Sequence, residues 1–129
     1  MPKQKIVLLI DDNPLLTGMY SAAFERKGLE VLVAHSGEDG LELARRQKPN
    51  LILLDILMPG IDGFGVLERL KGDLETKDIM VVVLTVVQRK EHEERAKKLG
   101  AAAYLVKSEG TLNEIVERIL QYLPNHEHK

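Results

Sequence analysis

Five residues with chemically useful side chains stand at the ends of short apolar runs in this sequence. Asp11 and Asp12 follow the first run, Asp55 follows a later one, Thr85 ends another, and Lys107 follows the last. Carboxylate oxygens are the ligands that hard divalent cations such as Mg²⁺ prefer. A lysine ammonium can pair with carboxylates and can also bind a phosphoryl oxygen as a point charge. If the fold brings the five together, they suit a divalent cation and a phosphate group.

Each residue type also has an ordinary structural interpretation. A single aspartate commonly caps a helix or a turn, and we interpret Asp62 in this way. Threonine is common at strand ends, and a lone lysine is usually a surface residue. Three neighbouring carboxylates repel one another, however, which raises the pKa of at least one of them unless a cation is present. The combination of three carboxylates with a lysine therefore favours a metal site with a counter-ion.

The apolar runs predict strands, and the amphipathic segments between them predict helices. Strands are expected at 6–10, 30–34, 51–54, 80–84 and 103–106. The run 6–10 is apolar at every position, which is typical of a strand covered on both faces, whereas 30–34 is less apolar and suits a sheet edge. Helices are expected at 14–27, 36–47, 88–99 and 111–123, and in the segment carrying Phe64, Leu67 and Leu70.

Strict alternation of strands and helices predicts an α/β fold with a doubly wound, five-stranded parallel sheet. Ligands of such open sheets bind beyond the carboxyl ends of the strands. That edge is where the five candidate residues stand, so the fold should gather them. We expect one domain over residues 1–129, with a core spanning 5–123 and a polar tail at 124–129.

Composition excludes several other classes of protein. The net charge of −2 lacks the basic excess of a nucleic-acid-binding domain. The apolar runs are far shorter than the roughly 20 residues that span a bilayer, so no membrane segment is expected. There is no cysteine, which excludes thiolate metal sites and fits a cytoplasmic protein. The histidines are isolated or lie in the tail, and we expect them to be solvated and to bind no metal: His35, His92, His126 and His128.

Four segments together resemble the receiver domains of two-component response regulators, including the chemotaxis response regulator. They are Val-Leu-Leu-Ile-Asp-Asp at 7–12, Leu-Ile-Leu-Leu-Asp-Ile-Leu-Met-Pro-Gly-Ile-Asp-Gly at 51–63, Leu-Thr at 84–85 and Ala-Tyr-Leu-Val-Lys at 103–107. The joint pattern is specific, although no single segment is. The resemblance implies a flavodoxin-like (βα)5 fold with strand order 2-1-3-4-5.

The resemblance also implies a metal site and a phosphorylation site. Asp55 would be the nucleophile that accepts a phosphoryl group from a histidine of a sensor kinase or of a histidine phosphotransfer protein. Asp12, Asp55 and the main-chain carbonyl of Leu57 would bind Mg²⁺, or Mn²⁺, directly. Asp11 would bind the cation through water. The domain would catalyse only its own phosphorylation and slow dephosphorylation, and would not otherwise be an enzyme.

The remaining implied roles concern the switch between two states. Lys107 and Thr85 would bind the aspartyl phosphate at Asp55. Tyr104 would move inward together with Thr85, which would change the face formed by the fourth helix, fifth strand and fifth helix. A partner or a missing output domain that prefers one form of this face would read the signal.

The sequence departs from the family pattern at four loop positions. Val86 follows Thr85 where a very small residue is usual, and Ser108 follows the lysine where proline is usual. A cis bond before serine would cost about 3–4 kcal/mol, so we predict a trans Lys107–Ser108 bond. Leu57 and Val87 are apolar where a polar side chain could orient a hydrolytic water, which predicts a long-lived phosphoryl group.

Two alternative functions are compatible with parts of this pattern. One is a small phosphatase with Asp55 as its nucleophile, although the chain has no insertion large enough for a cap. The other is a pseudo-receiver that binds partners without phosphorylation, although all five key residues are present. The segment 89–98 is densely charged, and we expect a monomer or a weak dimer.

Overall fold

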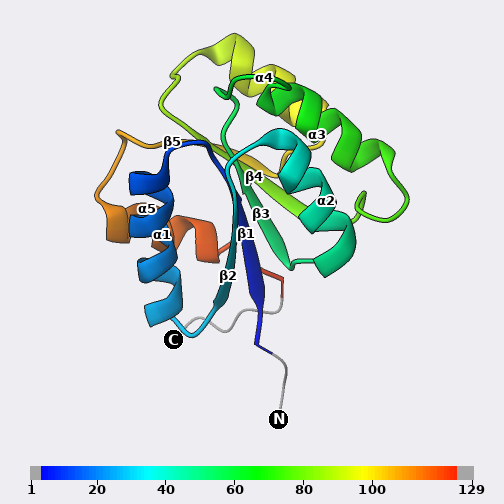
Figure 1. Cartoon of the computed structure of the whole chain (residues 1–129). Coiled ribbons are helices and arrows are strands. Elements are labelled where there is room, and N and C mark those ends of the chain that lie inside the picture. The colour runs from blue at the N-terminus through cyan, green and yellow to red at the C-terminus, as the bar shows by residue number, and fades with distance from the viewer. Residues whose placement is uncertain (1–3, 125–129) are drawn as a thin grey trace.

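The computed structural model describes residues 4–124, which form a single parallel sheet with helices on both faces (Figure 1). The sheet order is β2-β1-β3-β4-β5, as the resemblance implied. Its strands are β1 (Ile6–Ile10), β2 (Glu30–Ala34), β3 (Leu51–Leu54), β4 (Met80–Thr85) and β5 (Ala103–Val106). The predicted strands are confirmed, with β4 one residue longer because Thr85 still pairs with Val106. Residues 125–129 of the predicted tail lie outside the described residues.

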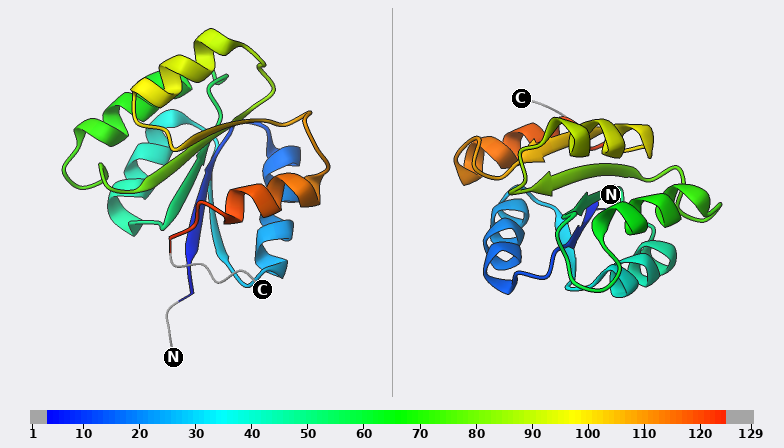
Figure 2. Two further views of the ribbon diagram at one scale, coloured as in Figure 1. Left: turned by 180° about the vertical axis from the view of Figure 1, so that it is seen from behind. Right: turned by 90° about the horizontal axis from the view of Figure 1, so that it is seen from above.

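Five helices alternate with the strands and form two layers. They are α1 (Pro14–Arg26), α2 (Gly37–Gln47), α3 (Gly63–Gly72), α4 (Lys90–Lys98) and α5 (Leu112–Leu120). One apolar cluster joins α1 and α5 to the sheet, and a second joins α2, α3 and α4 to the opposite face. Figure 2 shows the sheet between these two layers. Among residues 4–124, no helix has both the length and the apolar character that crossing a bilayer requires.

The continuous apolar strands follow from burial on both faces. In β1, Val7 and Leu9 belong to the cluster under α1 and α5, whereas Leu8 and Ile10 belong to the other. Successive side chains of a strand point to opposite faces, so a strand covered twice has no polar position. The edge strand β2 pairs only with β1 and is largely half-buried, which confirms the interpretation of its weaker apolar pattern.

Local signals fix the helix ends that lie near the strand termini. Asn13 caps α1 by accepting a hydrogen bond from the Leu16 N–H at 3.2 Å, and Asp62 caps α3 in the same way through Gly65 at 2.9 Å. The predicted cap at Asp62 is therefore confirmed. Helix α4 begins two residues later than predicted, because residues 86–89 belong to the loop after β4. These caps set where the loops at the carboxyl edge leave the sheet.

Candidate functional site

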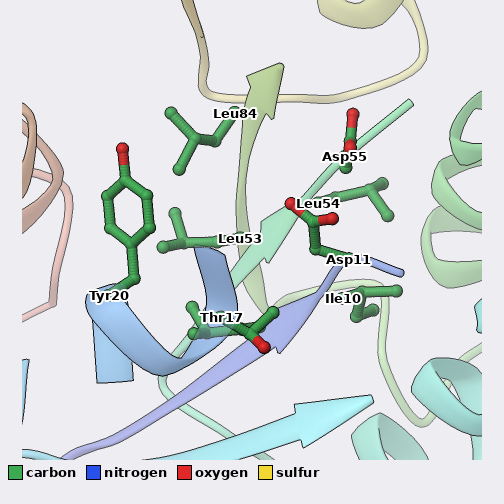
Figure 3. Close-up of a pocket in the computed structure, with 9 residues that line it drawn as sticks. Ile10, Asp11, Thr17, Tyr20, Leu53, Leu54, Asp55 and Leu84 are labelled. Atoms are coloured by element: carbon green, nitrogen blue, oxygen red, sulfur yellow. The ribbon is translucent and has the colours of Figure 1, made fainter. Parts of the chain in front are cut away.

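The fold brings the three candidate carboxylates to one place at the carboxyl edge of the sheet. Asp11, Asp12 and Asp55 each offer an oxygen, and these oxygens lie within 4.8 Å of one another. Asp11 and Asp55 are buried, whereas Asp12 is exposed. Figure 3 shows Asp11 at the end of β1 and Asp55 at the end of β3, two neighbouring strands. The site is thus an acidic pocket in which two carboxylates are buried and the third, Asp12, is exposed.

Lys107 reaches this pocket from the end of β5. Its Nζ lies 2.6 Å from Asp11 Oδ2 and 3.6 Å from Asp55 Oδ2, and its side chain is only 9% exposed. The strand order explains this reach, because β5 lies beside β4 and its carboxyl end faces the same edge. The ammonium therefore partly neutralises two buried carboxylates that would otherwise repel each other.

The environment of Asp55 raises the pKa of its carboxyl group above the usual value. Burial is the largest cause, and the negative charge of Asp11 adds to it. Three influences act in the opposite direction: the Leu57 N–H, which donates to Asp55 Oδ1 at 3.1 Å, the charge of Lys107, and the polar hydroxyl of Thr85 nearby. Oδ1 is therefore engaged by the main chain, while Oδ2 faces the lysine.

Asp11 is held by hydrogen bonds at its main chain and at both carboxylate oxygens. Oδ1 accepts from the Asn13 N–H at 3.0 Å, and Oδ2 accepts from Lys107. Its N–H donates to the carbonyl of Ala34 at 3.0 Å. Its own carbonyl lies 3.0 Å from His35 Nδ1. His35 is exposed, as predicted, but one nitrogen of its ring also contacts the loop that carries the carboxylates, which the sequence analysis did not predict.

Thr85 and Tyr104 are connected through the main chain of Val87. Thr85 is fully buried, and its hydroxyl oxygen accepts a long hydrogen bond of 3.4 Å from the Val87 N–H. The half-buried Tyr104 donates its hydroxyl to the Val87 carbonyl at 2.6 Å. The loop between β4 and α4 is thus attached to β4 on one side and to β5 on the other.

Two of the loop positions that depart from the family pattern contact site residues through their main chain: the Leu57 N–H bonds to Asp55 and the Val87 N–H to Thr85. Leu57 is 48% exposed and Val86 is 58% exposed. Val87 is half-buried. No cis peptide bond occurs among residues 4–124, so the predicted trans Lys107–Ser108 bond is confirmed.

A small cavity lies beneath the carboxylates, between α1 and the sheet (Figure 3). Its volume is about 20 Å³, which is room for one water molecule. Thr17 and Tyr20 line it from α1, and burial followed by the charge of Asp11 raises the pKa of Tyr20. Neither residue was predicted from the sequence to lie near the site. Their spacing of three residues on the helix that follows the aspartate pair places them on one face of that helix, which could have indicated it.

The other non-tail histidine, His92, is half-buried and packs partly against the protein. Its ring meets the edge of Phe64 at a centroid distance of 5.4 Å, and its Nδ1 is buried without a hydrogen-bond partner. The prediction that His92 is solvated is therefore wrong for its Nδ1, although the residue as a whole is half-buried. Among the described residues, the group of possible metal ligands includes neither His35 nor His92.

The donor set fits a hard divalent cation. Three carboxylate oxygens within 4.8 Å, one of them on an exposed side chain, leave room for water in the coordination sphere. Mg²⁺ and Mn²⁺ both favour such oxygen-rich, partly hydrated sites. Lys107 is already paired with one of the carboxylates, so a cation would share Asp11 with the ammonium.

Comparisons of sequence agree with this site. A family model described as the response regulator receiver domain matches residues 7–120. Protein PilH of Pseudomonas aeruginosa is 37% identical over 116 residues, covering 88% of this chain and 96% of PilH. The polar-differentiation response regulator DivK of Brucella ovis is 35% identical over 119 residues, covering 92% of this chain and 96% of DivK.

Comparisons of structure give the same family. The chemotaxis protein CheY4 of Vibrio cholerae aligns with a TM-score of 0.87 and 25% identity, covering 94% of this chain and 100% of CheY4. The Mn²⁺-bound form of response regulator Rcp1 aligns with a TM-score of 0.80 and 27% identity, covering 97% and 99%. With the acidic pocket at the ends of β1 and β3 and Lys107 facing it, these matches show that the chain belongs to the receiver domains of response regulators in two-component signalling.

Proposed function

We propose that this chain is a phosphoacceptor module in which Asp55 takes a phosphoryl group from a phosphohistidine. The donor is a sensor histidine kinase or a histidine phosphotransfer protein. The observation that carries the proposal is the position of Lys107, whose ammonium lies 2.6 Å from Asp11 and 3.6 Å from Asp55. A buried cation beside a buried carboxylate stabilises the charge that develops on a phosphoryl group in transfer.

The two oxygens of Asp55 have different tasks in this mechanism. Oδ1 accepts the hydrogen bond from the Leu57 N–H, which fixes the carboxylate plane. Oδ2 faces Lys107 and is the oxygen that attacks phosphorus. The new P–O bond forms as the P–N bond to the donor histidine breaks, and the electron pair of that bond stays with the imidazole nitrogen, which takes up a proton. The transfer needs positioning and charge neutralisation more than covalent help.

The same carboxylates would hold a divalent cation. Asp12, Asp55 and the carbonyl of Leu57 would bind Mg²⁺ directly, and Asp11 would bind it through water. A bound Mg²⁺ would supply positive charge to the oxygens of the phosphoryl group. Lys107 would then move its hydrogen bonding from Asp11 toward the phosphoryl oxygens, since these carry more charge than a carboxylate.

Phosphorylation would change the shape of the domain through Thr85. A phosphoryl group on Asp55 adds acceptor oxygens, which attract the hydroxyl of Thr85. The Val87 N–H bond to that hydroxyl oxygen is long, at 3.4 Å, and is therefore weak enough to yield. Because Tyr104 is bonded to the Val87 carbonyl, a shift of this loop is passed to β5 and to the α4–β5–α5 face.

Phosphate labelling separates this function from its two alternatives. The protein is incubated with acetyl phosphate and Mg²⁺, and bound phosphate is measured by intact mass, with Asp55→Asn and an EDTA sample as controls. We expect up to one phosphoryl group per chain, lost in both controls. Multiple turnover of phosphate would indicate a phosphatase, and a chain that stays unlabelled would indicate a pseudo-receiver. In the proposed form, the whole chain acts as one receiver domain and catalyses only its own phosphorylation and dephosphorylation.

A further inference from the structure

The loop between β1 and α1 carries two of the three carboxylates, and its course is set at Asp11. Asp11 is the first residue beyond β1, and its N–H still bonds to the Ala34 carbonyl of β2. Its carbonyl lies past the end of the strand pairing, which closes at Ile10 and Ala34. The partner of that carbonyl is a side chain, His35, 24 residues further along the chain.

The chemistry of this contact fixes which atom carries the proton. A carbonyl oxygen can only accept a hydrogen bond, so His35 Nδ1 must be protonated and must donate. The N···O distance is 3.0 Å, which is ordinary for such a bond. His35 is the first residue after β2 and is exposed, so the protein core does not require an imidazole at this position.

We propose that His35 is a positioning residue for the metal site, acting through the peptide bond between Asp11 and Asp12. The carbonyl of Asp11 and the nitrogen of Asp12 belong to one planar unit. A hydrogen bond that holds this carbonyl in place therefore also holds the peptide plane that carries the nitrogen of Asp12. The orientation of Asp12 is set in part by that plane. The inference rests on the proposed function, since it assigns a role toward the cation that these carboxylates would hold.

Asp12 needs such support more than its neighbours do. Both carboxylate oxygens of Asp11 already accept hydrogen bonds, from the Asn13 N–H and from Lys107, and Asp55 is held by the Leu57 N–H. Asp12 is exposed, so the direction of its carboxylate depends mainly on the backbone that carries it. Releasing the Asp11 carbonyl should therefore weaken cation binding while leaving the core unchanged.

Two substitutions separate the hydrogen bond from the bulk of the ring. His35→Asn places an amide NH₂ at the δ position, where it can donate to the same carbonyl. His35→Leu keeps a side chain of comparable reach but has no donor. A role that depends on the donor predicts that asparagine restores the parent behaviour and leucine does not.

The test is Mn²⁺ binding to the metal-free protein, measured from the electron paramagnetic resonance signal of free Mn²⁺. We expect His35→Leu to weaken Mn²⁺ binding by about threefold to tenfold, the loss of one hydrogen bond, and His35→Asn to stay within about twofold of the parent. Asp12→Asn is the positive control for loss of a ligand. Urea unfolding of the same metal-free variants shows whether a loss of affinity is separate from a loss of stability.

The possible failures of this test differ from one another. The positioning role is overturned if His35→Leu binds Mn²⁺ as tightly as the parent, or if His35→Asn binds it as weakly as His35→Leu. In either case the proposed function stands. A loss of affinity that merely follows partial unfolding of His35→Leu also overturns the positioning role. A parent protein that binds no Mn²⁺ overturns the metal part of the proposed function and this role together.

Discussion

The ammonium of Lys107 lies 1.0 Å closer to Asp11 than to Asp55, at 2.6 Å against 3.6 Å. The lysine therefore pairs first with Asp11, which would hold the cation through water, and only second with Asp55, which would be both a direct ligand and the nucleophile. Lysine and cation would compete for the same oxygens before phosphorylation, whereas both would bind the phosphoryl group afterwards.

Lys107→Met should have opposite effects on metal binding and on phosphorylation. Removing the competing charge should tighten Mn²⁺ binding by roughly tenfold, equivalent to ~1.4 kcal/mol. Removing the charge that stabilises the phosphoryl group should slow labelling of Asp55 by about a hundredfold or more. Mn²⁺ titration and the rate of labelling by acetyl phosphate measure the two. Weaker Mn²⁺ binding in this variant would contradict the competition.

Asp55→Asn should stabilise the metal-free protein at neutral pH. Burial raises the pKa of Asp55, which means that its charged form is unfavourable in the folded state. An amide of the same shape removes that charge, and we expect the free energy of unfolding to rise by roughly 1 kcal/mol. Urea unfolding in EDTA measures this. Asp62→Asn serves as the matched control, because asparagine caps a helix as well as aspartate does. Equal stability of Asp55→Asn and the parent would count against the argument.

The aspartyl phosphate should be long-lived for a receiver domain. Hydrolysis needs a water held in line with phosphorus, and neither Leu57 nor Val87 has a side chain that can orient one. We expect the variant combining Leu57→Asn and Val87→Glu to lose phosphate at least about tenfold faster than the parent. The measurement follows bound phosphate after the donor is removed, with Mg²⁺ present. If the parent loses phosphate as fast as the variant does, the side chains at 57 and 87 do not control the position of the hydrolytic water.

The unphosphorylated protein should be a monomer or a weak dimer. The α4 surface is densely charged, and one of its pairs, Lys97 with Glu93 at 3.1 Å, lies within the helix itself. Exposed pairs of this kind contribute little to association and are screened by salt. Light scattering at low micromolar concentration measures the molecular mass. A tight dimer that resists added salt is the result that would refute this expectation.

A pH-dependent contribution to stability should come from Asp73, far from the site. The Glu75 N–H at 2.9 Å and the guanidinium of Arg45 at 2.7 Å hold the pKa of this carboxyl below its usual value. Its stabilisation is therefore complete above the unfolded pKa of about 3.9 and is lost as the pH falls through the lower folded pKa. Asp73→Asn should be less stable than the parent at neutral pH, and the two should converge in acid. A difference in stability between the two proteins that stays constant as the pH falls would show that the lowered pKa of Asp73 is not its cause.

The parts of the fold that depend on burial could be predicted from sequence. Strands β1 and β3 are covered on both faces, so every residue is apolar and the pattern is unambiguous. The carboxyl edge then places Asp11, Asp55 and Lys107 together without further information. Helix α4 was harder, since it buries only Ala96 and its apolar pattern is too thin to mark where it begins.

The contacts that escaped prediction share a physical reason. The partner of His35 is a main-chain carbonyl, and the partner of Tyr104 is another, at Val87. Every residue offers a carbonyl, so no residue type in the sequence marks these bonds. The half-buried position of His92 depends on Phe64, which lies on a different helix. Such packing follows from the approach of two elements and not from either one alone.

Because α4 is attached to the core by few buried contacts, its movement can be separated from the stability of the domain. This helix has a single fully buried residue, Ala96, and its other contacts include Arg95 lying 4.2 Å over the ring of Phe64. Moving α4 therefore opens little of the core, and such sub-global motions can occur far below the free energy of global unfolding. Substitutions in the core under α1 can lower the melting temperature without affecting the proposed switch at α4. Substitution of the exposed Arg95 can therefore affect the proposed switch at α4 with little change in the melting temperature.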